Sequence, residues 1–184
     1  MSNIWVISDT HFGHENFLKF EHEGKKIRNF ADTKQMDEFM IEQWNSVVQD
    51  GDKVYHLGDV YFGSEQNAQY ILGALKGKKR LILGNHDNGK SKVLHQHFQK
   101  IMLWRVWKTE KMIFSHIPIH PSNLIIGLGK NGDDVKHVIT SMFNVHGHIH
   151  QNKSPEGPYF NVCVEHHDYK PISFDVLADV AKNR

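Results

Sequence analysis

Short apolar runs rich in β-branched and aromatic residues recur along the 184-residue chain, and Gly, Asp, Asn or His bounds each of them. This arrangement is typical of β-strands. We therefore expect strands over residues 4–7, 54–57, 81–83, 112–114, 143–145 and 159–164.

A different spacing of apolar positions predicts four helices. Residues 33–48 place Met36, Met40 and Trp44 near helical spacing, after Asp32 or Thr33 as a suitable N-cap. Similar faces predict helices over residues 64–75, 133–142 and 174–181. Strands that alternate with helices indicate an α/β domain. Because no linker or low-complexity tract divides the chain, we expect a single domain over residues 1–184.

The composition narrows the choice of partners and compartment. Lys and Arg number 22 against 21 Asp and Glu, and this balance disfavours long nucleic acid as a partner without excluding it. Cys163 is the only cysteine, so no disulfide forms within the chain. The sequence shows neither a signal-peptide pattern nor a long apolar stretch. We therefore expect a cytoplasmic protein that does not contact membranes; the sequence does not indicate its oligomeric state.

Histidine accounts for 15 residues, and the informative ones stand beside Asp, Asn or Gly in five short blocks. The blocks are Asp9-Thr10-His11, Gly58-Asp59-Val60, Gly84-Asn85-His86-Asp87, Ser115-His116 and Gly147-His148-Ile149-His150. Four of them directly follow an expected strand, and Ser115-His116 overlaps the end of one. Because loops at the carboxyl ends of strands converge in α/β sheets, we expect these blocks to build one site.

The side chains in these blocks are metal ligands of mixed chemistry. Asp9 and His11 are two residues apart, so an extended backbone would send both side chains to one face. Asp59 offers a carboxylate able to bridge two ions. The other candidates supply an amide oxygen and three imidazoles, from Asn85, His116, His148 and His150. Such a set suits Mn, Fe, Zn or Ni better than an all-oxygen Ca or Mg site or a thiolate site.

As an ordered set, the blocks resemble the motifs D-x-H, G-D, G-N-H-[DE], [GS]-H and G-H-x-H of the calcineurin-like metallophosphoesterase superfamily. The extension Phe12-Gly13-His14 is similar to a compact bacterial and phage branch of it. The resemblance implies a four-layer α/β/β/α sandwich with two central mixed sheets. It also implies two divalent ions, with Mn expected first and Fe, Zn or Ni as alternatives. One ion would be held by Asp9, His11 and His150, the other by Asn85, His116 and His148, with Asp59 bridging them.

The same resemblance implies hydrolysis of a phosphate ester by in-line attack of a metal-bridging hydroxide. His86 would protonate the leaving oxygen, and Asp87 would either fix the tautomer of His86 or simply cap the loop. His14 is a candidate substrate contact or an ordinary loop histidine. Arg28 is a candidate phosphate clamp or an exposed loop arginine.

The substrate is the least determined part of this interpretation. A small nucleotide-like or cyclic phosphodiester is the first choice, whereas a phosphomonoester or a nucleic acid is the alternative on the same dinuclear site. A non-catalytic metal-bound binding module is an alternative of another class, which the complete ligand set and His86 disfavour. The glycine-rich residues 124–132 are expected to form a mobile loop that borders the site, because they lie between two of the blocks.

Overall fold

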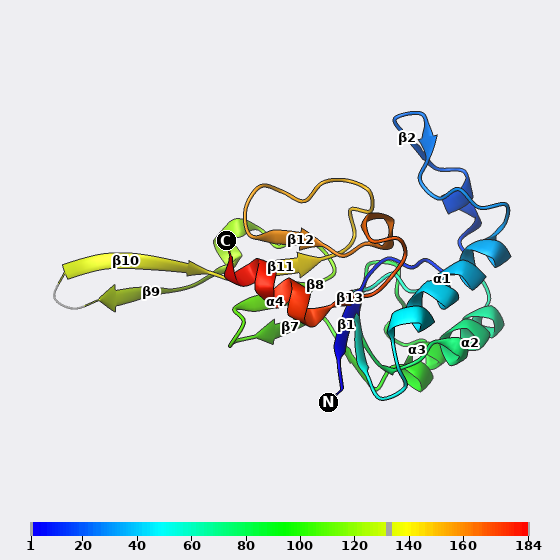
Figure 1. The fold of residues 1–184 in the computed structure, drawn as a ribbon, viewed down its shortest axis with the longest axis horizontal. Coiled ribbons are helices and arrows are strands. Elements are labelled where there is room, and N and C mark those ends of the chain that lie inside the picture. Colours follow the sequence, from blue (N-terminus) through cyan, green and yellow to red (C-terminus); the bar gives the residue numbers. More distant parts are fainter. Residues whose placement is uncertain (1, 132–133, 184) are drawn as a thin grey trace.

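The computed structural model describes residues 2–131 and 134–183, and two mixed sheets form its centre (Figure 1). The first sheet has the order β13 (Ile172–Ser173), β1 (Ile4–Ile7), β4 (Lys53–His56), β5 (Lys78–Ile82) and β6 (Lys100–Met102). Its strands are parallel except for β13, which runs antiparallel to β1. The second sheet has the order β12 (Tyr159–Asn161), β11 (Phe143–His146), β8 (Met112–Ser115) and β7 (Trp104–Trp107). In this sheet β7 runs antiparallel to its parallel neighbours.

Three α-helices pack against the first sheet. They are α1 (Thr33–Val47), α2 (Glu65–Ala74) and α3 (Lys92–His97). The apolar face expected on α1 is buried, because Met36, Met40 and Trp44 share one core with sheet residues such as Val54 and Leu81. Asp32 caps α1 by accepting a hydrogen bond of 2.8 Å from the backbone of Gln35.

A second core lies between the sheets, where Val6 and Tyr55 of the first meet Phe114 and Val145 of the second. The last helix, α4 (Phe174–Lys182), packs beside β1 and β13 and adds its apolar side chains to this core. The short 3-10 helix η2 (Pro121–Asn123) leads into Leu124, which packs against the second sheet beside Tyr159. The predicted fold class, an α/β sandwich around two central mixed sheets, is confirmed.

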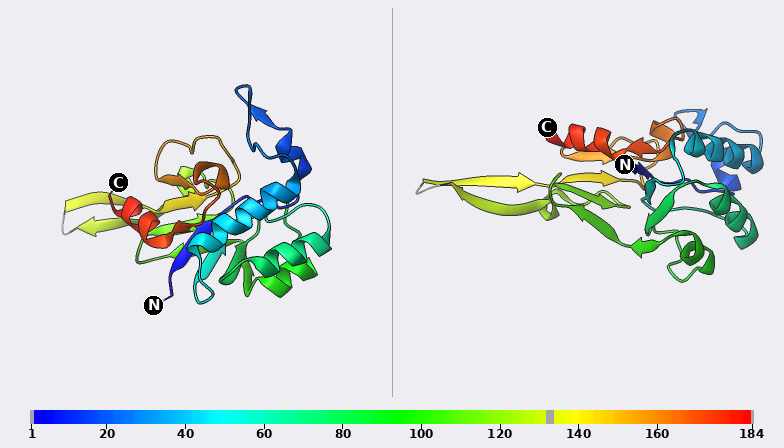
Figure 2. Two further views of the ribbon diagram at one scale, coloured as in Figure 1. Left: turned by 45° about the vertical axis from the view of Figure 1, so that its right-hand side comes forward. Right: turned by 60° about the horizontal axis from the view of Figure 1, so that its bottom comes forward.

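An antiparallel arm projects from this body and corrects two expectations (Figures 1 and 2). It consists of β9 (Ile125–Asn131) and β10 (Asp134–Ser141). The helix predicted over 133–142 is therefore wrong for its described residues, since a run rich in β-branched residues favours a strand. The loop expected over 124–132 is likewise a strand over most of its length, and Gly132 lies outside the described residues.

The remaining elements are short. A hairpin of β2 (Glu21–His22) and β3 (Lys25–Lys26) follows the 3-10 helix η1 (Glu15–Leu18), and η3 (Val164–His166) follows β12. Among the helices of the described residues, none has both the length and the apolar character needed to cross a bilayer.

Candidate metal centre

Loops at the carboxyl ends of five strands meet between the two sheets. The first sheet supplies Asp9 and His11 after β1, Asp59 after β4, and Asn85 and His86 after β5; the second supplies His116 after β8, and His148 and His150 after β11. Backbone hydrogen bonds join these loops, from the amide of Asp9 to the carbonyl of Gly58 (3.0 Å) and from Gly147 to His116 (2.8 Å). The structure thus brings all seven expected metal ligands into one region.

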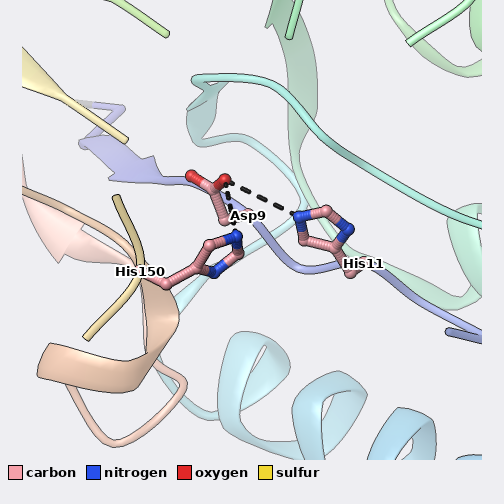
Figure 3. A group of neighbouring side chains, drawn as sticks. All are labelled: Asp9, His11 and His150. Carbon is pink, nitrogen blue, oxygen red and sulfur yellow. Dashed lines mark ion pairs between the residues drawn. The ribbon is translucent and has the colours of Figure 1, made fainter. Parts of the chain in front are cut away.

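Asp9, His11 and His150 form one group, shown in Figure 3. Oδ1 of Asp9 lies 3.7 Å from Nε2 of His11 and 3.7 Å from Nε2 of His150. One potential ligand atom from each of the three residues lies within 4.8 Å of the other two. A single cation could therefore be held by all three side chains.

Asp59, His116 and His148 form a second group of the same kind. Oδ2 of Asp59 lies 3.5 Å from Nε2 of His116 and also 3.6 Å from Nε2 of His11 in the first group. One carboxylate oxygen therefore faces both groups, as a bridging ligand must. Oδ1 of Asn85 lies 2.8 Å from Nε2 of His116, which adds the expected amide oxygen to the second group.

The chemistry of the first group fits a cation. Asp9 is fully buried, yet its Oδ1 has no hydrogen-bond partner among the described residues, and neither has either ring nitrogen of His11. Buried polar atoms without partners are costly, so an ion accounts for their arrangement. Burial lowers the pKa of His11. Burial by itself would raise the pKa of Asp9, but contacts with His11 and other histidines lower it. These shifts favour the neutral imidazole and the carboxylate, which are the forms that bind metal.

Five of the ligand residues have left-handed backbone conformations. The φ angles are 59° for Asp9, 47° for His11, 57° for Asp59, 72° for His148 and 48° for His150. Non-glycine residues adopt this region at a cost of about 1–3 kcal/mol each and cluster at functional sites. Asp9 and His11 therefore converge through two turns of this kind, not through the extended backbone expected from their spacing.

Two glycines make the close packing of these loops possible. A Cβ atom on Gly147 would collide with Oγ of Ser8 and Oδ2 of Asp9. A Cβ atom on Gly84 would collide with Oδ1 of Asp59. The glycines in the G-N-H-D and G-H-x-H blocks are thus required because ligand carboxylates pass directly over the backbone.

Arg28 lies behind the centre and not at its surface, which corrects the expectation of a phosphate clamp. Its side chain is fully buried, and all of its N–H groups have acceptors. The acceptors are the carbonyls of Asp9 (2.6 Å) and Thr10 (2.6 Å), Oε1 of Glu165 (3.0 and 2.7 Å) and Sδ of Met36 (3.8 Å). No N–H group is left for a phosphate, so Arg28 instead fixes the Asp9-Thr10 backbone. The competing interpretation, an exposed loop arginine, is also wrong.

Glu165 connects this arginine to the first ligand group. Its Oε1 lies 3.2 Å from Nδ1 of His150, the ring nitrogen that does not face Asp9. Despite burial, Arg28 and His150 lower the pKa of Glu165 to about 2, so it is a carboxylate. Such a carboxylate fixes the orientation and tautomer of a ligand histidine. Cys163 adds a further contact by donating from Sγ to Oδ2 of Asp9 at 3.2 Å.

Glu165 and Cys163 are parts of the site that were not expected from the sequence. The available signal was their position at the end of the strand expected over residues 159–164, since the ligand-bearing blocks also stand at strand ends. Asn161 also contacts the site, because its side-chain amide donates to the backbone carbonyl of His150 at 2.9 Å.

The proposed catalytic residues occupy different surroundings. The carboxylate of Asp87 accepts three backbone N–H groups, from Asp59 (2.9 Å), Val60 (2.9 Å) and Gly84 (2.8 Å). Among the described residues it has no hydrogen bond with His86, so Asp87 acts as a loop cap and not through the His86 tautomer. His86 donates its backbone N–H to Oδ1 of Asp59 at 2.9 Å.

A hollow of about 380 Å³ opens beside the ligands, and His86 and His14 both line it together with His11 and His150. The ring of His14 stacks on Phe62 with 4.0 Å between centroids. Burial and neighbouring positive charge lower the pKa of His14 to about 4, so its imidazole is neutral near pH 7. Both expected substrate-facing histidines therefore border the space next to the candidate metal centre.

The fold and the two groups of candidate ligands define a protein of the metal-dependent hydrolase type, and comparison with known proteins identifies the family. The sequence profile of the calcineurin-like phosphoesterase family matches residues 2–179, so the chain belongs to that family. Membership implies metal-dependent hydrolysis of a phosphate ester, and it confirms the resemblance found in the motifs.

Individual relatives agree with this assignment. An uncharacterised protein of Methanocaldococcus jannaschii is 32% identical over 188 residues, which cover 96% of this chain and 90% of that protein. The gene 66 protein of Mycobacterium phage L5 is 42% identical over 91 residues, or 47% of this chain and 41% of the phage protein. A crystal structure of a protein of unknown function from Aquifex aeolicus has a TM-score of 0.71 at 27% identity and covers 98% of this chain and all of its own. The phage similarity supports the compact branch.

Proposed function

We propose that this protein hydrolyses small phosphodiesters with the help of two divalent cations. The observation that carries the proposal is the position of Asp59, whose Oδ2 lies within 3.6 Å of a histidine from each ligand group. Bound cations would supply an acidified water and neutralise charge on the phosphate oxygens. Manganese is the first candidate, as the family resemblance implies, and the same carboxylate, amide and imidazole ligands also suit Fe, Zn and Ni.

The chain itself supplies the acid and the orientation. His86 borders the same hollow as His11 and His150, so its ring can reach an ester oxygen of a phosphate held there. A proton from His86 would go to the leaving oxygen as the P–O bond breaks, and the products are an alcohol and a phosphate monoester. Asp87 fixes the loop that carries His86 by holding the backbone of Gly84 and Asp59.

Two substitutions separate metal binding from acid catalysis. Asp59→Asn keeps the size of the side chain but removes the charge that faces both ligand groups, so we expect lower metal content and loss of activity. His86→Ala should retain two metal ions per chain and lose about 10²–10⁴-fold in kcat on bis(p-nitrophenyl) phosphate. Tyr70→Ala, at a side chain that is 71% exposed on α2, is the matched control and should change neither quantity.

The assay uses purified protein stripped of metal and reloaded separately with Mn, Fe, Zn or Ni. Activity on the diester that survives both Asp59→Asn and His86→Ala would refute the assignment. A panel of cyclic nucleotides, dinucleotides, phosphomonoesters and single-stranded DNA then ranks the substrate classes. Faster turnover of monoesters than of every diester would replace the diester proposal with a phosphomonoesterase.

A further inference from the structure

A second hollow, of about 410 Å³, touches the candidate metal centre through Asn85 and His116. It shares no lining residue with the hollow that contains His86. Its other walls are almost entirely apolar, and three of its large side chains are exposed: Leu103 by 62%, Trp104 by 59% and Ile117 by 52%. An apolar space with two polar groups at one end has the character of a small-molecule pocket.

The sheet register explains why this tryptophan stands next to a metal ligand. Trp104 on β7 pairs with Ser115 on β8, directly before His116. Strand β7 is the edge of the second sheet, so no further strand of the described residues pairs with Trp104 on its other side. The strand pair thus fixes the backbone of Trp104 beside the ligand set, and its half-exposed indole offers an aromatic surface to a bound molecule.

We propose that this second hollow, lined by Trp104, Leu103 and Ile117 and called the Trp104 pocket below, binds a planar apolar or aromatic group that a phosphodiester keeps after hydrolysis. The inference rests on the proposed function and extends it. His86 lines the other hollow, so the ester group that leaves as an alcohol belongs there. The group retained on phosphorus then points to the Trp104 pocket. A phosphomonoester has no such group and would leave this pocket empty.

Two diesters with the same leaving group test this assignment: phenyl p-nitrophenyl phosphate and methyl p-nitrophenyl phosphate. In each case water adds to phosphorus, the P–O bond to p-nitrophenol breaks, and phenyl or methyl phosphate is the second product. The metal-loaded wild type should prefer the phenyl diester in kcat/KM. Trp104→Ala should lose about tenfold on the phenyl diester, the size of an aromatic contact of ~1.4 kcal/mol, and under about twofold on the methyl diester.

Binding provides a readout that does not depend on turnover. Phenylphosphonate and methylphosphonate differ only in the group that would enter the pocket, and calorimetry gives their Kd values for the metal-loaded protein. Trp104→Ala should weaken the binding of phenylphosphonate and leave the Kd of methylphosphonate unchanged. Ile117→Ala is a second variant of the same pocket, and Tyr70→Ala on α2 is the control with an exposed aromatic elsewhere.

The possible failures are distinguishable. If the wild type hydrolyses neither diester, the proposed function fails. If it hydrolyses both and the two pocket variants lower both rates equally, only the Trp104 pocket is refuted. If Trp104→Ala converts an oligomer into a monomer in sedimentation experiments without changing the phenyl preference, the exposed apolar face is an interface between copies of the chain, and the inference is overturned.

Discussion

Replacing Arg28 by methionine tests whether the buried arginine holds the metal loop in place. The substitution removes one half of a buried ion pair, since Nη2 of Arg28 lies 2.7 Å from Oε1 of Glu165 and the two side chains are 0% and 4% exposed. Breaking such a pair on one side costs about 3–5 kcal/mol, because the remaining charge stays buried. The carbonyls of Asp9 and Thr10 lose this donor as well, which adds about 1 kcal/mol each. We expect a loss of about 5–7 kcal/mol in the free energy of unfolding.

A double-mutant cycle assigns this loss to the pair. Glu165→Gln keeps an oxygen that can accept from His150 but removes the charge, so the double variant Arg28→Met with Glu165→Gln leaves no unpaired buried ion. It should be less destabilised than the sum of the two single variants by about 2–3 kcal/mol. Lys34→Met is the control, because the ion pair of Lys34 with Glu38 is exposed and should contribute nothing measurable.

Urea unfolding of the metal-free proteins, followed by tryptophan fluorescence, measures the four free energies. A loss below about 1 kcal/mol for Arg28→Met, or strict additivity in the cycle, would refute the structural role of the pair. Metal titration then tests its connection to the site. Because Glu165 orients His150, Glu165→Gln should weaken the affinity of the first ligand group by about 10–100-fold.

Two further substitutions address the glycine packing and a buried acid. Gly147→Ala should displace Asp9 and abolish metal binding at the first ligand group in a metal titration. Gly51→Ala is the control and should bind metal normally, because the space around its Cβ position is open. Equal metal affinities of the two variants would contradict the packing argument. Burial raises the pKa of Asp37 from 3.8 to about 6, so the folded protein holds this proton more tightly than the unfolded chain and stability falls as the pH rises through that window. Asp37→Asn should remove this fall in stability. In urea unfolding of metal-free protein, the free energy of unfolding of the variant minus that of the wild type should increase by about 2 kcal/mol between pH 4 and pH 7. A difference that stays constant over this range would show that the pKa of the Asp37 carboxyl is not raised.

Local periodicity was a reliable guide for the longer elements that pack against the core on one face, although it did not predict α3, β6 or β7. The strand expected over residues 4–7 is β1 without any change of bounds, and the helix expected over 33–48 is α1 over Thr33–Val47. The guide was wrong over residues 133–142, where β-branched residues occur at positions that also fit a helix. There the described residues form β10, whose only paired strand is β9 within the described part of the sheets. A two-stranded arm outside the two central sheets does not need the one-sided burial pattern by which a core strand is recognised in a sequence.

Some residues of the site can likewise be predicted from local sequence, and others cannot. The ligand residues can be predicted from the sequence because each stands in a short block at the end of a strand, and because the ability to bind metal depends on residue type. The ion pair of Arg28 and Glu165 cannot be predicted from the sequence, because the two residues are 137 positions apart and neither belongs to a block. Their meeting depends on β12 and η3 returning beside the loop after β1. Only the assembled fold brings these segments together.

The energetics of the ligand loops explain why so much structure supports them. Asp9 and His11 combine left-handed backbones with buried polar atoms that have no hydrogen-bond partner among the described residues. Both features oppose folding, so an arrangement of this kind persists only where surrounding contacts over-determine it. Arg28, Cys163 and the backbone N–H of His148 supply such contacts, by holding the Asp9 carbonyl and carboxylate from three separate segments of the chain. These contacts position the ligand side chains without help from an ion, and a cation that paired with Oδ1 of Asp9 and a ring nitrogen of His11 would offset the cost of burying those atoms.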